Sequence, residues 1–80
     1  MNKYFICVNN DPGDKNLMEI IYQPFMTQPY YKAKNYAVVA EADGKDEAFL
    51  LVKNMIEAFV TQNPDCDFNK FKEWRLNENR

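Results

Sequence analysis

The chain has 80 residues, of which 46% are hydrophobic and 15% aromatic, and its formal net charge at pH 7 is −2. This length predicts a single domain over residues 1–80, and the aromatic content excludes an intrinsically disordered chain. No apolar run is long enough to span a membrane, and the first residues have no signal-peptide pattern. We therefore expect a cytoplasmic protein without a membrane partner.

Two residue types that enzymes use often are missing. The chain contains no histidine and no serine, which removes the imidazole base, the serine nucleophile and the commonest side-chain ligand of transition metals. Cys7 and Cys66 could form one disulfide, but reduced thiols are the expected state. The acidic segments lack calcium-loop spacing, and two glycines leave no phosphate-binding loop. We expect a protein that is not an enzyme, with no catalytic residue, metal or cofactor.

The first part of the chain favours β-structure. Residues 3–10 alternate β-forming side chains and predict a first strand, followed by a tight turn over residues 11–16. Residues 17–26 are almost continuously apolar, and we expect a second strand that pairs with the first. A short helix over residues 16–22 is the alternative, because Asn16 could cap it.

Two prolines mark the connection to the next element, whose sequence is QPFMTQPYYKAKNY. Pro24 and Pro29 disfavour a helix, so we expect residues 27–34 to form a rigid extended crossing. Successive side chains of an extended chain point in opposite directions, so Tyr30 and Tyr31 cannot both face a core. The aromatic residues of this segment either close the core or form a contact surface, and at least one of the two tyrosines should be exposed.

A strand and a long helix follow this connection. Residues 35–42 predict a third strand, and residues 42–62 predict the clearest helix of the chain. Asp43 could cap the helix, and Asn63 with Pro64 should end it. Its apolar face is broad and comprises Ala48, Phe49, Val52, Met55, Ile56, Phe59 and Val60.

The last residues fit two different elements. Phe68, Phe71 and Trp74 have helical spacing, whereas Lys72, Trp74 and Leu76 alternate as in a strand. We expect a final strand over residues 70–77, with a helix as the alternative. The predicted fold class is therefore α+β, a small antiparallel sheet of three to four strands, in the order β-β-β-α-β, with one amphipathic helix packed on one face.

Small size, the missing catalytic residues and the aromatic segment favour a non-catalytic protein-binding module. Subunits of larger assemblies belong to this class, as do small inhibitors that phages or mobile elements encode against host machinery. The expected partner is another protein, and an open sheet edge also favours a homodimer. The residues expected to bind the partner are Tyr30, Tyr31, Lys32, Lys34 and Trp74.

The alternative is a nucleic-acid-binding protein. Basic residues interleaved with aromatic residues can hold phosphates and stack bases. If the final strand paired with residues 35–42, the basic and aromatic groups would form one surface. A pI near 5.0 argues against this interpretation. The residues concerned are Lys32, Lys34, Lys70, Lys72, Arg75 and Arg80, beside Tyr30, Tyr31, Phe71 and Trp74.

Overall fold

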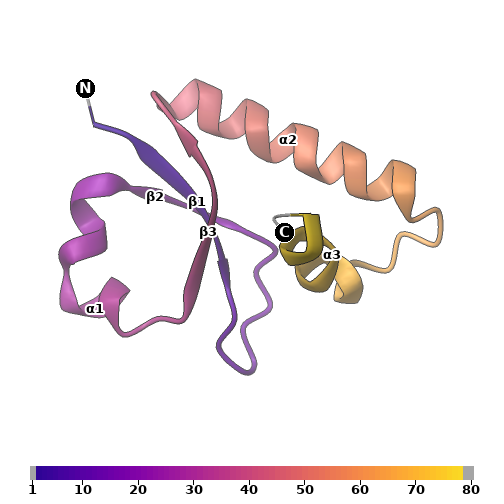
Figure 1. Cartoon of the computed structure of the whole chain (residues 1–80), viewed down its shortest axis with the longest axis horizontal. Helices are drawn as coiled ribbons and strands as arrows, with labels where there is room; N and C mark the ends of the chain where they lie inside the picture. The colour runs from indigo at the N-terminus through magenta and orange to yellow at the C-terminus, as the bar shows by residue number, and fades with distance from the viewer. Residues whose placement is uncertain (1, 79–80) are drawn as a thin grey trace.

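Three strands form an antiparallel sheet whose central strand is the first of the chain (Figure 1). The computed structural model describes residues 2–78. Strand β1 (Tyr4–Asn9) pairs with β2 (Glu19–Tyr22) on one side and with β3 (Tyr36–Ala42) on the other. The edges of the sheet are therefore β2 and β3. The predicted α+β class with a small antiparallel sheet is confirmed.

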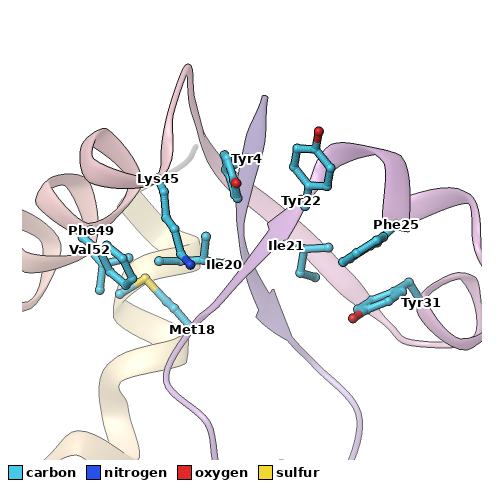
Figure 2. A pocket seen from close by; sticks show the side chains of 10 residues that line it. All are labelled: Tyr4, Met18, Ile20, Ile21, Tyr22, Phe25, Tyr31, Lys45, Phe49 and Val52. Carbon is cyan, nitrogen blue, oxygen red and sulfur yellow. The ribbon is translucent and has the colours of Figure 1, made fainter. Parts of the chain in front are cut away.

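The two faces of the sheet meet different parts of the chain. Figure 1 shows α2 (Lys45–Gln62) and α3 (Phe71–Glu78) on one side of the strands and the segment between β2 and β3 on the other. Ile20 of β2 points toward α2 (Figure 2), and its partner in register is Ile6, which is fully buried. Ile21 points the opposite way, toward the segment between β2 and β3 (Figure 2). Side chains of β2 thus contact both layers that flank the sheet.

The core between the helices is built around two phenylalanines. Phe59 of α2 and Phe71 of α3 are both fully buried, and their ring centroids lie 5.2 Å apart. Trp74 packs on both rings, with its centroid 5.3 Å from Phe59 and 5.7 Å from Phe71. Full burial of one large apolar side chain contributes about 2 kcal/mol. This aromatic cluster therefore holds α3 against α2.

The predicted final strand over residues 70–77 is wrong, because these residues form α3. A 3-10 turn, η2 (Phe68–Lys70), leads into the helix. In a strand, Phe71 and Trp74 would lie on opposite faces. Three residues apart in a helix, they lie on the same side, and both reach Phe59. The order of elements therefore ends in a helix.

The connection between β2 and β3 is also helical where the sequence predicted an extended crossing. It contains a 3-10 helix, η1 (Gln23–Thr27), and a short α-helix, α1 (Pro29–Lys32). Pro24 and Pro29 each stand in the first turn of their own helix, where a backbone N–H would have no partner within the helix. The prolines start helices here, and β2 occupies only four residues of the predicted strand over residues 17–26.

Helix α2 begins slightly later than predicted, and its cap is different. Its N-cap residue is Gly44, which makes no side-chain cap hydrogen bond. The Asp43 carboxylate instead accepts a hydrogen bond from Lys3 Nζ at 2.9 Å. The Asp43 N–H donates to Glu47 Oε2 at 3.3 Å. An acid in the first turn therefore accepts from the N–H of the residue that precedes the N-cap.

Candidate protein-binding groove

A groove with a volume of about 690 Å³ follows the open edge of β2 (Figure 2). Both faces of this edge strand, the first half of α2 and the segment between β2 and β3 contribute side chains to it. Lys45 alone among the lining residues is charged. We call this the β2 groove, and its lining residues are Tyr4, Met18, Ile20, Ile21, Tyr22, Phe25, Tyr31, Lys45, Phe49 and Val52.

One wall of the β2 groove comes from α2. Phe49 and Val52 lie beside Met18 and Ile20 in Figure 2. Phe49 is 55% exposed, although Phe59 on the same helix is fully buried. The first half of α2 therefore presents apolar surface to solvent at this groove.

The opposite wall is a chain of aromatic rings. Tyr22 meets Phe25 edge-on, with centroids 5.6 Å apart, and Phe25 stacks on Tyr31 at 6.1 Å. Tyr31 in turn stacks on Tyr36 of β3 at 6.5 Å. Edge-on and offset-stacked arrangements are the favourable ones for aromatic pairs. Because each ring is held by its neighbours, this wall is formed without a partner.

The adjacent tyrosines of α1 have different surroundings. Tyr31 is half-buried and lines the groove beside Ile21. Tyr30 is 63% exposed, and its ring meets that of Tyr31 edge-on with centroids 5.0 Å apart. Lys34 Nζ lies 4.8 Å from the centroid of Tyr30, within cation–π distance. Tyr31 therefore helps to close this face of the sheet, whereas Tyr30 is free for contact.

The backbone of β2 offers hydrogen-bonding groups to the groove. The Gln23 N–H donates to the Lys3 carbonyl at 2.8 Å, so Gln23 directs its backbone groups toward the strand β1 side of the pair. Ile21 and Glu19, two and four residues earlier, do the same. In an antiparallel pair, every second residue directs its N–H and C=O to the neighbouring strand. Ile20 therefore directs both groups, and Tyr22 directs its N–H, away from β1 and into the open edge. The Tyr22 carbonyl belongs to the N-cap of η1, where it accepts the first hydrogen bond of that helix.

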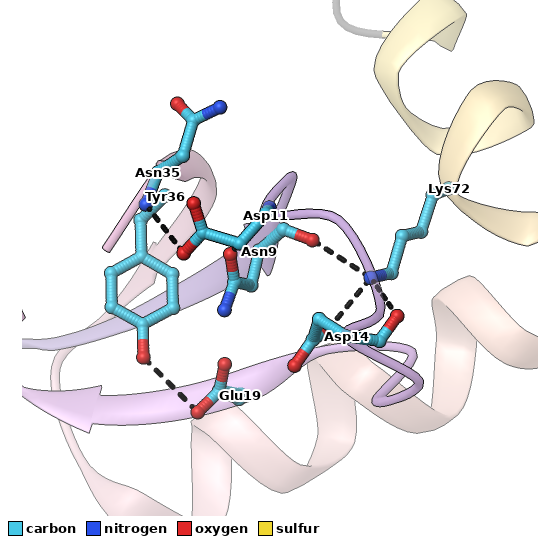
Figure 3. A network of polar contacts seen from close by, with 7 residues as sticks. All are labelled: Asn9, Asp11, Asp14, Glu19, Asn35, Tyr36 and Lys72. Carbon is cyan, nitrogen blue, oxygen red and sulfur yellow. Dashed lines mark hydrogen bonds and ion pairs between the residues drawn. The ribbon is translucent and has the colours of Figure 1, made fainter.

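A cluster of titratable groups lies on the face of the sheet behind the aromatic wall. The Tyr36 hydroxyl donates to Glu19 Oε1 at 3.1 Å (Figure 3). Burial, followed by the Glu19 carboxylate, raises the pKa of Tyr36 above its usual range and raises that of Cys7 to about 11. Cys7 and Cys66 are both free thiols. The fully buried Cys7 is therefore neutral at physiological pH and is not a nucleophile.

The charge in the lining of the β2 groove is positive, because Lys45 is its one charged residue. Residues 20–40 contain two lysines, Lys32 and Lys34, and no aspartate or glutamate. Lys45 lines the groove and forms no ion pair with an acidic side chain of residues 2–78. The Glu19 carboxylate, at the end of β2, is engaged by Tyr36. The groove therefore favours ligands that carry negative charge.

The residues predicted to bind a partner do not form one surface. Trp74 belongs to α3, on the other side of the sheet from α1 (Figure 1). It packs in the aromatic cluster described above, and its Nε1–H donates to Gln62 Oε1 at 3.0 Å. The expected continuous surface depended on a final strand beside β3, and that segment is a helix. The predicted residues that lie together, on α1 or just after it, are Tyr30, Tyr31, Lys32 and Lys34.

Lys72 is held inside the protein (Figure 3). Its Nζ donates to the Asp14 carboxylate at 2.7 Å, the Asp14 carbonyl at 2.9 Å and the Asn9 carbonyl at 2.7 Å. Both side chains of the ion pair are largely shielded from solvent, with exposed fractions of 25% and 15%. Lys72 therefore ties α3 to the loop after β1.

The other basic side chains near α3 also have partners. Lys70 pairs with Asp65 at 3.3 Å, and Arg75 donates to the Val39 carbonyl at 3.2 Å. Arg80 lies outside the described residues. The basic groups considered for nucleic acid are thus divided between two sides of the sheet, and those on α3 and η2 serve contacts within the protein.

The interpretation of the sequence missed the part that α2 and β2 play in the groove. It assigned Phe49 and Val52 to the buried face of the helix and Ile20 to a paired strand. One signal was present: Phe49 is followed by Leu50, so the apolar residues spread over more of the helix than one sheet can cover. Both are more than half exposed, at 55% and 54%.

No protein-family model, curated protein or solved structure matches the chain. Within residues 2–78, no group of three or more His, Cys, Asp or Glu side chains could hold a metal ion. None of the helices in the described part of the chain combines the length and the apolar character that crossing a membrane requires.

Proposed function

We propose that the protein is a non-catalytic protein-binding module that holds its partner in the β2 groove. The observation that carries this proposal is a groove whose lining is apolar or aromatic apart from Lys45 and includes exposed aromatic side chains. Phe25, Tyr30 and Phe49 are 43%, 63% and 55% exposed. A contiguous exposed apolar surface with a polar rim is typical of an interaction site. Lys45 lines the groove, and Lys32 and Lys34 lie on or just after α1, the helix that contributes Tyr31 to the groove.

The groove suits protein contact more than chemistry. Aromatic side chains give large contact area at little cost in conformational entropy and are common among residues that dominate binding energy. Complete burial of a large apolar side chain contributes about 2 kcal/mol, so the half-exposed Phe25 and Phe49 could each contribute about 1 kcal/mol on binding. The titratable cluster of Tyr36, Glu19 and Cys7 is turned inward and contributes no charged group to the groove lining.

The protein would act as a subunit of a larger assembly or as a small inhibitor, of the kind that phages and mobile elements direct against host machinery. Both roles require only that the groove bind a partner surface tightly. Of the four predicted residues around α1, Tyr31 lines the groove, and Tyr30, Lys32 and Lys34 are its neighbours in the chain.

The test is affinity capture from a lysate of the source cell, with and without nuclease, using matched variants. The groove variant combines Tyr31→Ala and Phe49→Ala. The control combines Leu50→Ala and Val60→Ala, which remove exposed apolar side chains of α2 that do not line the groove. We expect one stoichiometric protein to be recovered with the wild type and the control and lost with the groove variant.

Two results would contradict the proposal. Equal recovery with the groove variant would place the partner elsewhere on the surface. Loss of all captured protein on nuclease treatment would favour the nucleic-acid alternative and its lysines, Lys32 and Lys34. Circular dichroism of each variant checks that the fold is retained.

A further inference from the structure

We propose that the partner supplies an extended segment, rich in apolar residues and carrying acidic side chains, which adds to the sheet as a fourth strand beside β2. This inference rests on the proposed function, because it specifies what the β2 groove binds. It follows from the backbone of β2, from the two walls of the groove and from the charge around it.

The backbone favours strand addition. The N–H and C=O groups of Ile20 and the N–H of Tyr22 point into the open edge of the sheet, where a neighbouring strand would bond to them. Strand addition to such an edge draws its affinity from main-chain hydrogen bonds and its specificity from pockets for alternate side chains. At about 3.3 Å per residue, the four residues of β2 pair with a segment of similar length, roughly 13 Å.

The walls of the groove fit an extended segment. Successive side chains of an added strand would point alternately to the two faces of the sheet. On one face they would meet Phe49 and Val52, and on the other they would meet Phe25 and Tyr31. Both sets of contacts are apolar, so the segment should have consecutive apolar residues.

The charge around the groove distinguishes a different protein from a second copy of this chain. Residues 20–40 carry two lysines and no acid, and Lys45 lies in the groove itself. A second copy paired through its own β2 would bring a groove whose one charged lining residue is Lys45 against the same groove, and so would place like charges close together. A segment with acidic residues beside its apolar core would instead complement Lys45.

The experiment begins with a phage-displayed library of random peptides selected on the immobilised full chain. Enriched peptides are synthesised, and their affinities are measured for the wild type, Ile20→Pro and Ile20→Val. Proline removes the outward N–H while leaving the hydrogen bonds between β2 and β1, and it is tolerated on an edge strand. Valine keeps the N–H with a side chain of similar volume, so it is the matched control.

We expect the enriched peptides to contain consecutive apolar residues flanked by Asp or Glu. Ile20→Pro should weaken their binding by about tenfold or more, the effect of one lost hydrogen bond with its buried partner unsatisfied. Ile20→Val should change the affinity by less than about threefold. A chain assembled by ligation at Cys7 and Cys66, with an ester in place of the Ile20 amide, removes the same N–H with the side chain kept and replaces the proline variant if that variant unfolds.

Each other result overturns the inference in a recognisable way. Peptides that bind Ile20→Pro normally but not the groove variant would exclude strand addition and leave the proposed function intact. Enriched peptides without acidic residues would exclude the acidic partner. Failure to enrich any peptide would also overturn the inference of strand addition. The lysate capture tests the proposed function separately. Sedimentation of a dimer that Ile20→Pro dissociates would identify a second copy as the occupant.

Discussion

The two edges of the sheet are finished in different ways. On β3, Val39 is an extra residue opposite the junction of Ile6 and Cys7, where the register shifts, and Arg75 from α3 binds its carbonyl. A β-bulge and a covering element are two devices by which proteins prevent an edge from pairing with another chain. On β2, the outward groups of Ile20 and Tyr22 face a groove with apolar walls.

The two edges thus belong to two regions, one that stabilises the fold and one that is available to bind a partner. The region around α3 contains the aromatic cluster and the partly buried hydrogen bonds of Lys72. The side with β2 leaves large side chains half exposed. Changes on the first side should therefore lower the free energy of unfolding, and changes in the groove should leave it almost unaltered.

The largest effect is expected at the centre of the aromatic cluster. Phe59→Ala should lower the free energy of unfolding by about 4 kcal/mol, because it leaves a cavity against Phe71 and Trp74. Urea denaturation followed by circular dichroism measures this change. If the alanine variant does not fold, Phe59→Leu should still lower it by about 1 kcal/mol. An unchanged urea midpoint would show that the α3 side does not hold the fold together.

A smaller loss is expected where Lys72 joins α3 to the loop after β1. Lys72→Met should lower the free energy of unfolding by about 2 kcal/mol, because it leaves three acceptor groups of Asn9 and Asp14 without their donor. The control is Lys70→Met, which breaks an exposed pair and should cost less than about 0.5 kcal/mol. Equal urea midpoints for the two variants would contradict the larger stabilising role expected for Lys72.

Alkaline pH should lower the free energy of unfolding, because Cys7 is buried in the central strand of the sheet. Burial, and then Glu19, raises the pKa of Cys7 from 9.0 to about 11 in the folded protein. The unfolded chain therefore loses its proton first, so stability is complete below pH 9 and falls as the pH rises toward 11. The loss by pH 11 should be about 2 kcal/mol.

Urea titrations at a series of pH values measure this slope, and Cys7→Ala should flatten it. Tyr36, whose pKa is also raised by burial and by Glu19, contributes in the same direction, so a residual slope should remain in the variant. An identical slope with and without the thiol would exclude Cys7 as its source.

The smallest effect on stability is expected at the groove. Phe49→Ala should change the free energy of unfolding by less than about 1 kcal/mol, because the side chain is already 55% exposed. The same urea assay that detects Phe59→Ala measures it. A loss as large as that of Phe59→Ala would show that the groove wall is part of the core and would remove the distinction between the two edges.

Local pattern was enough to predict the sheet and the long helix. Alternating apolar residues identify β1 and β3, and Asn63 with Pro64 ends α2 as expected. The strand predicted over residues 70–77 was wrong, because the helix there depends on the contacts of Phe71 and Trp74 with Phe59. Their own sequence fits both a helix and a strand, and the packing against α2 selects the helix.

The groove was only partly predictable for the same reason. The sequence pointed to Tyr30 and Tyr31, since aromatic residues are concentrated there. It could not show that Phe49, distant in sequence, would share a groove with Tyr31. Nor could it separate Trp74 from them, because that requires knowing on which side of the sheet each helix packs.

The position of Trp74 gives the protein a natural optical reporter. It is the single tryptophan of the chain, and it lies in the cluster with Phe59 and Phe71, on the other side of the sheet from α1. Its fluorescence emission should therefore follow the separation of α3 from α2 while remaining insensitive to a ligand beside β2. A single sample can thus be monitored for unfolding in the presence of a bound partner without a dye or a label.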